Sequence, residues 1–194
     1  MIITISGMPG SGKSTVARRL SEQLAYKRYY MGAVRRKAAR KLGMTLEEFN
    51  KKGETDASTD LFVEEYIQKL ARSCDNFIIE SRTAWAFIPQ SLKIFIYVDP
   101  REGAHRILKS LKNPRSARAR NEGTQLRTYK EVLRSVQDRV QSDDRRYQKY
   151  YNLRIGDKKN YDLYLDATNL SAEEEYKIVE KFVQTHISHS TKAT

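Results

Sequence analysis

The chain has few of the features that mark secreted and membrane proteins. Its 194 residues include a single cysteine, Cys74, which excludes an internal disulfide and a zinc site built from several thiolates. No apolar run approaches the roughly 20 residues of a membrane-spanning helix. No charged segment followed by an apolar one opens the chain, as it would in a secretory signal. We therefore expect a cytoplasmic protein that does not contact membranes.

Histidine is scarce as well, and negative charge is outnumbered. The three histidines are scattered, so we assign none of them to catalysis. The formal net charge is +12, and residues 101–154 contain fifteen lysines and arginines against six acidic residues. Such an excess is typical of nucleic-acid binding, but it also suits a protein that holds two polyphosphates side by side. The tyrosines do not form a stacking pair on one strand, so we do not expect nucleic acid as a partner.

The stretch GMPGSGKST, residues 7–15, is the clearest functional motif. It fits the pattern G-x-x-x-x-G-K-[ST], follows an isoleucine-rich segment, and precedes apolar residues at helical spacing. A strand, a glycine turn and a helix N-terminus together form a cradle for phosphates. Lys13 is expected to reach the β- and γ-phosphates of ATP, and the Ser14 hydroxyl to bind Mg²⁺. The residues expected to bind the nucleotide are Gly7, Met8, Pro9, Gly10, Ser11, Gly12, Lys13, Ser14 and Thr15.

The rest of the chain predicts alternating strands and helices. Capping boxes formed by Thr45 with Glu48, Thr128 with Glu131, and Ser171 with Glu174 mark helix starts. Because the apolar strands alternate with helices, we expect an α/β protein of the P-loop NTPase fold, with a five-stranded parallel sheet flanked by helices. The expected strands are the first six residues and residues 27–30, 77–80, 93–98 and 161–167.

Two further segments bear on the site. Ligands of a parallel sheet bind beyond the carboxyl ends of its strands. Glu80 ends the strand at 77–80, where its carboxylate is positioned to hold Mg²⁺ through a water; a solvated strand end is the alternative.

Residues 112–124 contain no apolar residue larger than alanine except Pro114, so we expect a mobile loop there.

Several stretches, taken in order, point to one family. They are ITISGxPGSGKST, GMTLEEF, a D-x-S-x-D pattern ending at Asp60, FIIESRTAW and DDRRYQKYY. Together they resemble the archaeal-type cytidylate kinases, within the P-loop nucleoside monophosphate kinases, over residues 2 to about 183. The resemblance implies one kinase domain over residues 1–194. Its parts would be a core at 1–30, 74–111 and 147–187, a small helical acceptor-binding insertion at 31–73, and a lid region at 112–146.

The resemblance also implies roles for individual side chains. Arg36 and Arg82 match arginines that would hold the phosphate of the acceptor. Asp60 is a candidate to bind the amino group of cytosine, with a helix-entry or salt-bridge role as the alternative. The residues that match the catalytic arginine pattern R-x-x-x-x-x-R-R-Y of the lid are Arg139, Arg145 and Arg146.

The chain departs from the family pattern in three places. Ala33 replaces a glutamate before Arg36, and Ser81 replaces a glycine before Arg82. Residues 112–124 match poorly. These departures bear on the choice of acceptor base and on the lid, and they leave the reaction class unchanged.

The surplus of arginine favours a phosphate as the acceptor. Phosphoryl transfer needs positioning and charge neutralisation more than covalent help. A phosphate acceptor is already anionic and needs no general base, whereas a hydroxyl acceptor is expected to need a carboxylate. Arg139 and Arg146 are seven residues apart and share one face of a helix. The planar fork of arginine suits paired bonds to phosphate oxygens.

We therefore predict an ATP- and Mg²⁺-dependent nucleoside monophosphate kinase, acting as a monomer on CMP and dCMP. One alternative is another small P-loop kinase whose acceptor is adenylate, uridylate or a small-molecule hydroxyl. A second alternative, suggested by the net charge, is a P-loop ATPase that acts on RNA. RNA-stimulated ATP hydrolysis without a phosphorylated small product would distinguish it.

Overall fold

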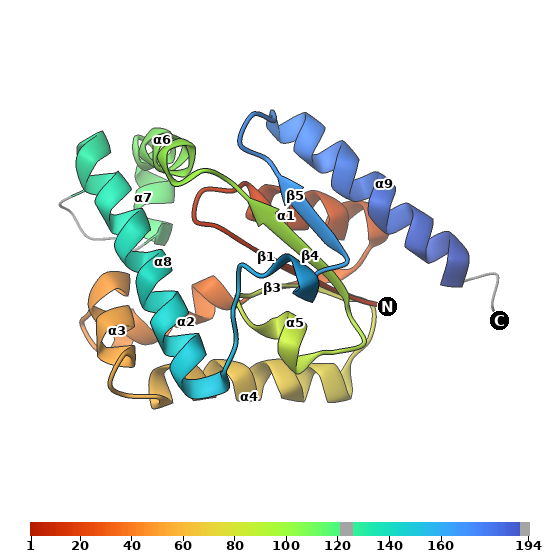
Figure 1. Ribbon diagram of the computed structural model, residues 1–194, viewed down its shortest axis with the longest axis horizontal. Helices are drawn as coiled ribbons and strands as arrows, with labels where there is room; N and C mark the ends of the chain where they lie inside the picture. The colour runs from red at the N-terminus through yellow and green to blue at the C-terminus, as the bar shows by residue number, and fades with distance from the viewer. Residues whose placement is uncertain (121–125, 191–194) are drawn as a thin grey trace.

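A parallel sheet forms the centre of the molecule. The computed structural model describes residues 1–120 and 126–190. In this part of the chain the sheet has five strands, in the order β2-β3-β1-β4-β5 (Figure 1). All neighbouring strands pair in parallel, which confirms the predicted sheet. The strands are β1 (Ile2–Gly7), β2 (Lys27–Tyr30), β3 (Phe77–Glu80), β4 (Leu92–Tyr97) and β5 (Leu163–Asp166).

Apolar side chains on both faces of the sheet build the core. Successive residues of a strand point to opposite faces, so Ile3 packs against α1 (Lys13–Leu24) and α9 (Ala172–Ser190). Ile2 instead packs toward α4 (Ser58–Ser73) and the short α5 (Ala84–Phe87). Helices therefore cover both faces, as the continuous apolar strands predict.

Three helices between β2 and β3 form a group to one side of the sheet. They are α2 (Met31–Lys41), α3 (Leu46–Gly53) and α4, and Figure 1 shows α3 farther from the strands than α2. Arg35 of α2 joins α4 through an ion pair with Asp60, at 2.5 Å. These helices occupy the region expected as the acceptor-binding insertion, and the division of the chain into functional parts stays a prediction.

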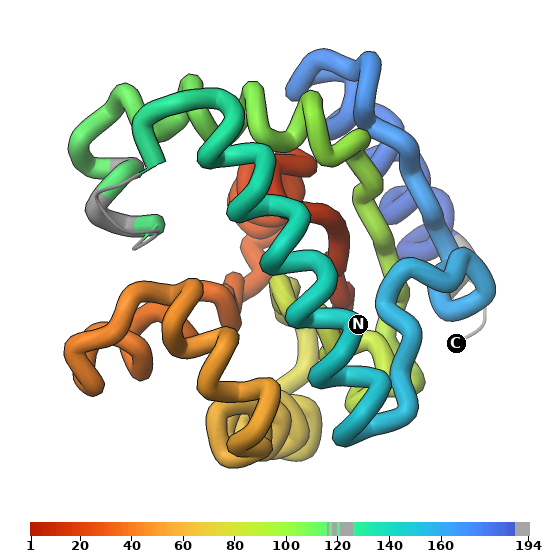
Figure 2. Tube along the Cα trace, turned by 60° about the vertical axis from the view of Figure 1, so that its left-hand side comes forward, coloured from red at the N-terminus to blue at the C-terminus, as the bar shows by residue number. Residues whose placement is uncertain are grey.

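The long helix α8 (Tyr129–Tyr151) connects two regions of the molecule. Val132 and Val136, near its start, pack against α6 (Pro100–Leu111). Its far end reaches the α4 group, because Arg146 forms an ion pair with Asp60 at 2.8 Å. Figure 2 shows α8 running across the front of the molecule between these regions. The chain then passes through a short 3₁₀ helix, η1 (Lys158–Asn160), to β5.

The prediction of a loop at residues 112–124 is wrong in part. The structure has a helix there, α7 (Pro114–Arg120), and residues 121–124 lie outside the described residues. Asn113 caps this helix, because its Oδ1 accepts the N–H of Arg115 at 3.0 Å. Proline suits the first helical position, where its missing N–H costs nothing. Local capping thus forms a helix in a segment without large apolar residues.

The three predicted capping boxes are confirmed. In α3 and α8 the side chain of Thr45 or Thr128 accepts a backbone N–H, and the glutamate three residues later accepts one in return. Ser171 and Glu174 make the same exchange before α9. These starts depend on residues three apart, so the sequence alone predicts them.

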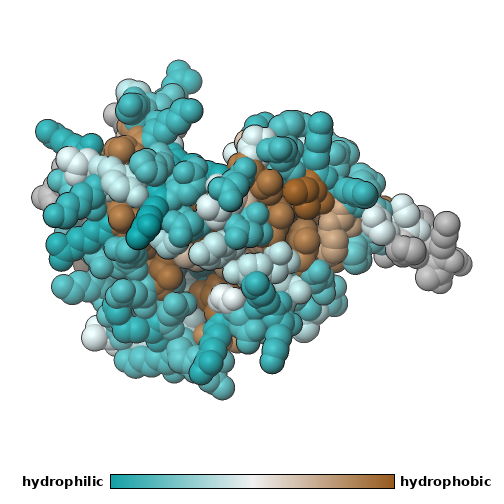
Figure 3. Space-filling view, turned by 45° about the horizontal axis from the view of Figure 1, so that its top comes forward, coloured by the Kyte–Doolittle hydropathy of each residue, from teal (hydrophilic) through white to brown (hydrophobic). Residues whose placement is uncertain are grey.

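The visible surface reflects the charged composition. In the space-filling view of Figure 3 most side chains are hydrophilic; the largest apolar area lies right of centre, and smaller apolar spots lie elsewhere. Within the described residues, no helix is both long enough and apolar enough to span a membrane.

Candidate functional site

The P-loop runs between β1 and α1, as expected. Gly10 (φ +79°) and Gly12 (φ +88°) have left-handed backbone conformations that L side chains rarely adopt. A Cβ added at Gly10 would also overlap the backbone of Gly103 in α6. The motif therefore needs glycine at these two positions, both for the turn and for close packing against α6.

A cavity of about 710 Å³ opens over the P-loop. Residues 9–15 of the predicted nucleotide-binding set line it. Gly7 and Met8 do not, but their carbonyl oxygens accept hydrogen bonds from Arg82 and Lys13. The cavity also reaches α2, α6, α8 and the segment between β5 and α9. Its place at the carboxyl ends of the strands is where ligands of such sheets bind.

Lys13 lines this cavity beside other cations. Its Nζ donates to the carbonyl oxygen of Met8 at 3.0 Å. Burial, together with the neighbouring Arg82 and Arg139, lowers the pKa of Lys13 well below its ordinary value. Negative charge entering the cavity would reverse this effect, since an opposite charge favours the protonated amine. The site is thus arranged for an anionic ligand.

Ser14 and Glu80, the two predicted magnesium ligands, touch each other. The Ser14 hydroxyl donates to Oε2 of Glu80 at 2.5 Å. Arg28, which the sequence reasoning missed, donates to Oε1 of the same carboxylate at 2.6 Å. Mg²⁺ prefers oxygen ligands and usually takes only one or two from the protein, with phosphates and waters completing the shell. A hydroxyl and a carboxylate next to the phosphate cradle fit this requirement.

Among the described residues no group of three or more histidine, cysteine or acidic side chains could hold a metal by itself.

The predicted acceptor arginines also line the cavity. Arg36 of α2 is buried, and it donates to the hydroxyl of Tyr30 at 2.8 Å and to the carbonyl oxygen of Arg120 at 2.6 Å. Arg82 donates through Nε to Asp143 at 2.9 Å and through Nη1 to the carbonyl oxygen of Gly7. The two arginines come from opposite ends of the sequence region 31–82 and meet over one cavity.

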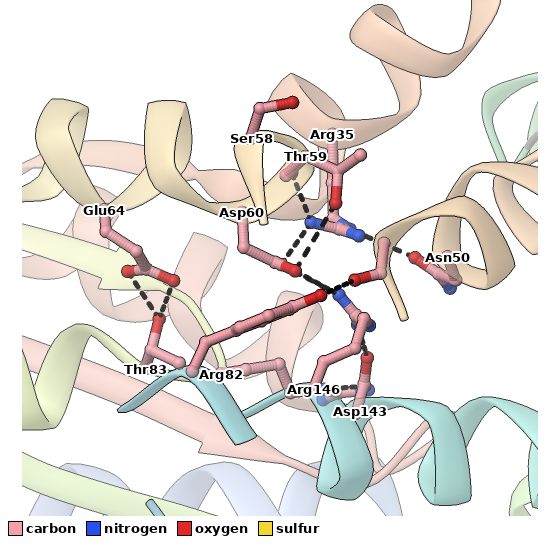
Figure 4. Close-up of polar contacts among 12 residues, drawn as sticks. Arg35, Asn50, Ser58, Thr59, Asp60, Glu64, Arg82, Thr83, Asp143 and Arg146 are labelled. Carbon is pink, nitrogen blue, oxygen red and sulfur yellow. Dashed lines mark hydrogen bonds and ion pairs between the residues drawn. The ribbon is translucent and has the colours of Figure 1, made fainter. Parts of the chain in front are cut away.

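Asp60 and Arg146 are not among the residues that line the cavity, and their predicted roles stay predictions. Both are fully buried, and Nη1 of Arg146 binds both oxygens of Asp60 at 2.8 Å (Figure 4). Asp60 also pairs with Arg35, and Arg146 with Asp143. The salt-bridge alternative given for Asp60 therefore describes its contacts in the structure. The physical reason is that α8 ends against α4, where a buried charge needs a partner.

The lid arginines fall into different surroundings. Arg139 lines the main cavity and also a smaller one of about 350 Å³ between α3 and α8. Arg145 lines only the smaller cavity and pairs with Glu54 at 2.8 Å. It lies about 100° around the helix from its neighbour Arg146, and its side chain is more than half exposed. Its place among the catalytic arginines stays a prediction.

Asp143 is the main residue that the sequence reasoning missed. It lines the cavity and contacts Arg82 and Arg146. Burial alone would raise its pKa, but Arg82, Arg146 and Arg139 outweigh this and hold the pKa well below its usual range. Its position four residues after Arg139, on the same helix face, was a signal available in the sequence. The result is a buried chain of alternating charges, Arg35, Asp60, Arg146, Asp143 and Arg82 (Figure 4).

Comparisons with known proteins agree with this geometry. A family model described as an AAA domain matches residues 3–127. The chain is 33% identical over 185 residues to the cytidylate kinase of Archaeoglobus fulgidus, covering 95% of each. It is 35% identical over 191 residues to the cytidylate kinase of Methanopyrus kandleri, covering 92% of this chain and 91% of the relative.

Solved structures show the same fold at low identity. A shikimate kinase from Bacteroides thetaiotaomicron superposes with a TM-score of 0.61 at 14% identity, covering 95% of this chain and 98% of that one. An uncharacterised protein from Eubacterium ventriosum superposes with a TM-score of 0.68 at 17% identity, with the same coverage. At such identities the likeness concerns the fold alone.

The sheet order, the P-loop and the cavity above it define a P-loop kinase. With relatives at this identity over nearly the whole chain, the protein belongs to the cytidylate kinase family, within the AAA-domain group of P-loop proteins.

Proposed function

We propose that the protein transfers the γ-phosphoryl group of ATP to CMP, and also to dCMP, in the presence of Mg²⁺. One observation carries the proposal: the P-loop, Arg36 and Arg82 line the same cavity, so two phosphate groups can meet in it. The relatives named cytidylate kinase, aligned over nearly their full length, support CMP as the acceptor.

Each part of the cavity then has a task. The P-loop backbone and Lys13 hold the β- and γ-phosphates. Ser14, and Glu80 through a water, would hold Mg²⁺, which would supply positive charge to the phosphate oxygens. Arg36 and Arg82 hold the acceptor phosphate. One of its oxygens attacks the γ-phosphorus, and the bond from that phosphorus to the β–γ bridging oxygen breaks, which releases ADP. Because the attacking oxygen is already anionic, no base is needed.

Arg139 is the lid arginine that we assign to the transferring phosphoryl group, since it lines the cavity near Lys13. Arg146 would act through Asp60 and Asp143, as a positioning residue. In this proposal residues 31–73 bind the acceptor and residues 112–146 form the lid. The monomeric state and the cytoplasmic location stay predictions from the sequence.

A coupled assay tests the proposal. ATP and Mg²⁺ are supplied with CMP, dCMP, UMP, AMP or shikimate, and ADP release and the phosphorylated product are both measured. We expect the highest kcat/KM with CMP and a lower but clear rate with dCMP. Turnover with shikimate alone would point to a hydroxyl acceptor. ADP release that depends on RNA and gives no phosphorylated small product would contradict a kinase.

A further inference from the structure

Glu175 is a buried carboxyl group in the cavity that the proposed mechanism does not use. It lies in the first turns of α9 and is only 1% exposed, yet it lines the cavity. Its Oε1 has no hydrogen-bond partner among residues 1–120 and 126–190. An unpaired buried carboxyl oxygen is costly, so its presence needs an explanation.

The packing of α9 does not supply this explanation. The helix buries Tyr176, Val179 and Val183 in the core beneath the sheet. An apolar side chain at position 175 would continue that packing without the cost of desolvating a carboxyl group. The chain instead has a glutamate at this position, and its carboxyl group meets the P-loop.

The carboxyl group lies directly against the start of α1. A Cβ added at Gly12 would overlap both carboxylate oxygens of Glu175. Gly12 is the N-cap of α1, next to the backbone N–H groups that bind phosphate in a P-loop. A negative charge on Glu175 would therefore lie beside the place where a polyphosphate binds.

Two cations face Glu175, and neither bonds it. Lys13 approaches from α1 and donates its hydrogen bond to Met8. Arg106 approaches from α6, but its Nη1 is 4.0 Å from Oε2, too far for a hydrogen bond. The other nitrogens of Arg106 are used elsewhere: Nε binds Glu102, and Nη2 binds carbonyl oxygens of Ala167, Thr168 and Leu170.

Burial and the two nearby cations have opposite effects on the pKa of Glu175, and the effect of burial is the larger. Burial raises the pKa of its carboxyl group to about 7, against the opposing pull of Arg106 and Lys13. A polyphosphate brought into the P-loop adds several negative charges close by, which disfavours the carboxylate further.

We propose that binding of the nucleoside triphosphate donor takes up a proton from solvent at Glu175. The neutral carboxyl group accommodates the phosphate chain, and the carboxylate repels it. The inference rests on the proposed function, because it requires a polyphosphate in the P-loop. By linkage, the affinity for the donor then falls as the pH rises through neutrality. A repulsion equivalent to one pKa unit corresponds to about a tenfold loss of affinity.

Calorimetric titration of ATP with Mg²⁺ tests this inference. The proton count comes from the difference in apparent enthalpy between two buffers of different ionisation enthalpy at pH 7.5. Glu175→Gln removes the proton site with little change in shape, and Glu173→Gln makes the same change in net charge at an exposed position two residues away. ATP carries its own titrating phosphate, which contributes equally to all three proteins.

We expect the wild type and Glu173→Gln to take up a larger fraction of a proton than Glu175→Gln. At pH 8.5, Glu175→Gln should bind ATP about tenfold more tightly than the wild type, and at pH 6 the two should bind about equally. If Glu175→Gln fails to fold, Glu175→Leu, which is also neutral, should give the same pattern.

Equal proton uptake by the wild type and Glu175→Gln would overturn the inference, as would weaker ATP binding by the variant at every pH. In both cases ATP still binds, so the proposed function stands. If ATP does not bind the wild type at all, the proposed function fails, and this inference fails with it.

Discussion

In the proposed mechanism, Lys13 is the residue on which donor binding depends most. Its amine is held by the carbonyl oxygen of Met8 and lies beside Arg82 and Arg139. Three cations near one point repel each other until an anion arrives, so the site favours a phosphate chain over water.

Lys13→Ala should lower kcat by on the order of 10²-fold, as the loss of one preorganised electrostatic contact does. Steady-state kinetics with CMP and ATP measure the effect. Folding should be nearly unchanged, because removing Lys13 also removes a cation that repels its neighbours. A thermal unfolding curve that matches the wild type is the control. Turnover close to that of the wild type would exclude Lys13 from the mechanism.

Arg36 allows a separate test of the acceptor side. Its side chain donates to the hydroxyl of Tyr30 and to the carbonyl oxygen of Arg120. Arg36→Ala should weaken CMP binding by about 1.5–3 kcal/mol, because charge-assisted bonds to phosphate are lost. The Kd for ATP measured without CMP should stay the same. Separate titrations of ATP and CMP into the variant measure both affinities.

Arg82→Ala is compared with Arg36→Ala in the same two titrations. Because it also donates to the carbonyl oxygen of Gly7, Arg82→Ala should weaken CMP binding and disturb ATP binding to a smaller extent. If either variant loses ATP affinity while CMP affinity is unchanged, the assignment of that arginine to the acceptor side is wrong.

At the scale of elements, buried charges join helices that are distant in the sequence. Asp60 of α4 binds Arg35 of α2 and Arg146 of α8. Arg146 also binds Asp143, which contacts Arg82 after β3. The helices α2 and α4 and the long helix α8 are thus connected through ion pairs that have little contact with water.

Asp60→Asn should lower the free energy of unfolding by about 3–5 kcal/mol, since removing one partner leaves Arg35 and Arg146 buried without their shared carboxylate. Urea unfolding followed by far-UV circular dichroism measures this loss. In Asp60→Asn combined with Arg146→Met, the two losses should not add, because the residues interact directly. A single-variant loss below about 1 kcal/mol, the range of exposed ion pairs, would contradict a role in joining α4 to α8.

At the scale of the whole molecule, one cavity is bordered by parts that come from most of the chain. The P-loop, α2, α6, α8 and the segment before α9 all line it. Positive side chains from the insertion and from α8 face the same volume, so an occupied cavity neutralises charges on several elements at once.

We expect residues 112–146 to close over the cavity only when both nucleotides are bound, since only then are arginines on both sides paired with phosphates. Closure would exclude water and suppress hydrolysis of ATP. Hydrogen exchange of backbone amides in 112–146 should slow more with a bisubstrate analogue than with ATP or CMP alone. Equal protection in the three complexes would argue against a closing lid.

The sequence alone was sufficient for features that depend on near neighbours. The P-loop needs nine consecutive residues, and each capping box needs residues three apart, so both follow from the local chain. The alternation of apolar strands and helices was also sufficient for the parallel sheet, because each strand must be covered on both faces.

The tertiary structure decided which charged residues face the cavity. Arg139 and Arg146 are two turns apart on α8, and Asp143 and Tyr147 also line the cavity. Arg139 lines it as well, whereas Arg146 is buried against Asp60. Glu175 shows no local signal either: a glutamate in the first turns of a helix is common at surfaces, and only the approach of α9 to Gly12 makes it part of the site. The sequence determines the charge and the length of each side chain. Its partners depend on elements far apart in the chain, and these are determined only when the helices pack.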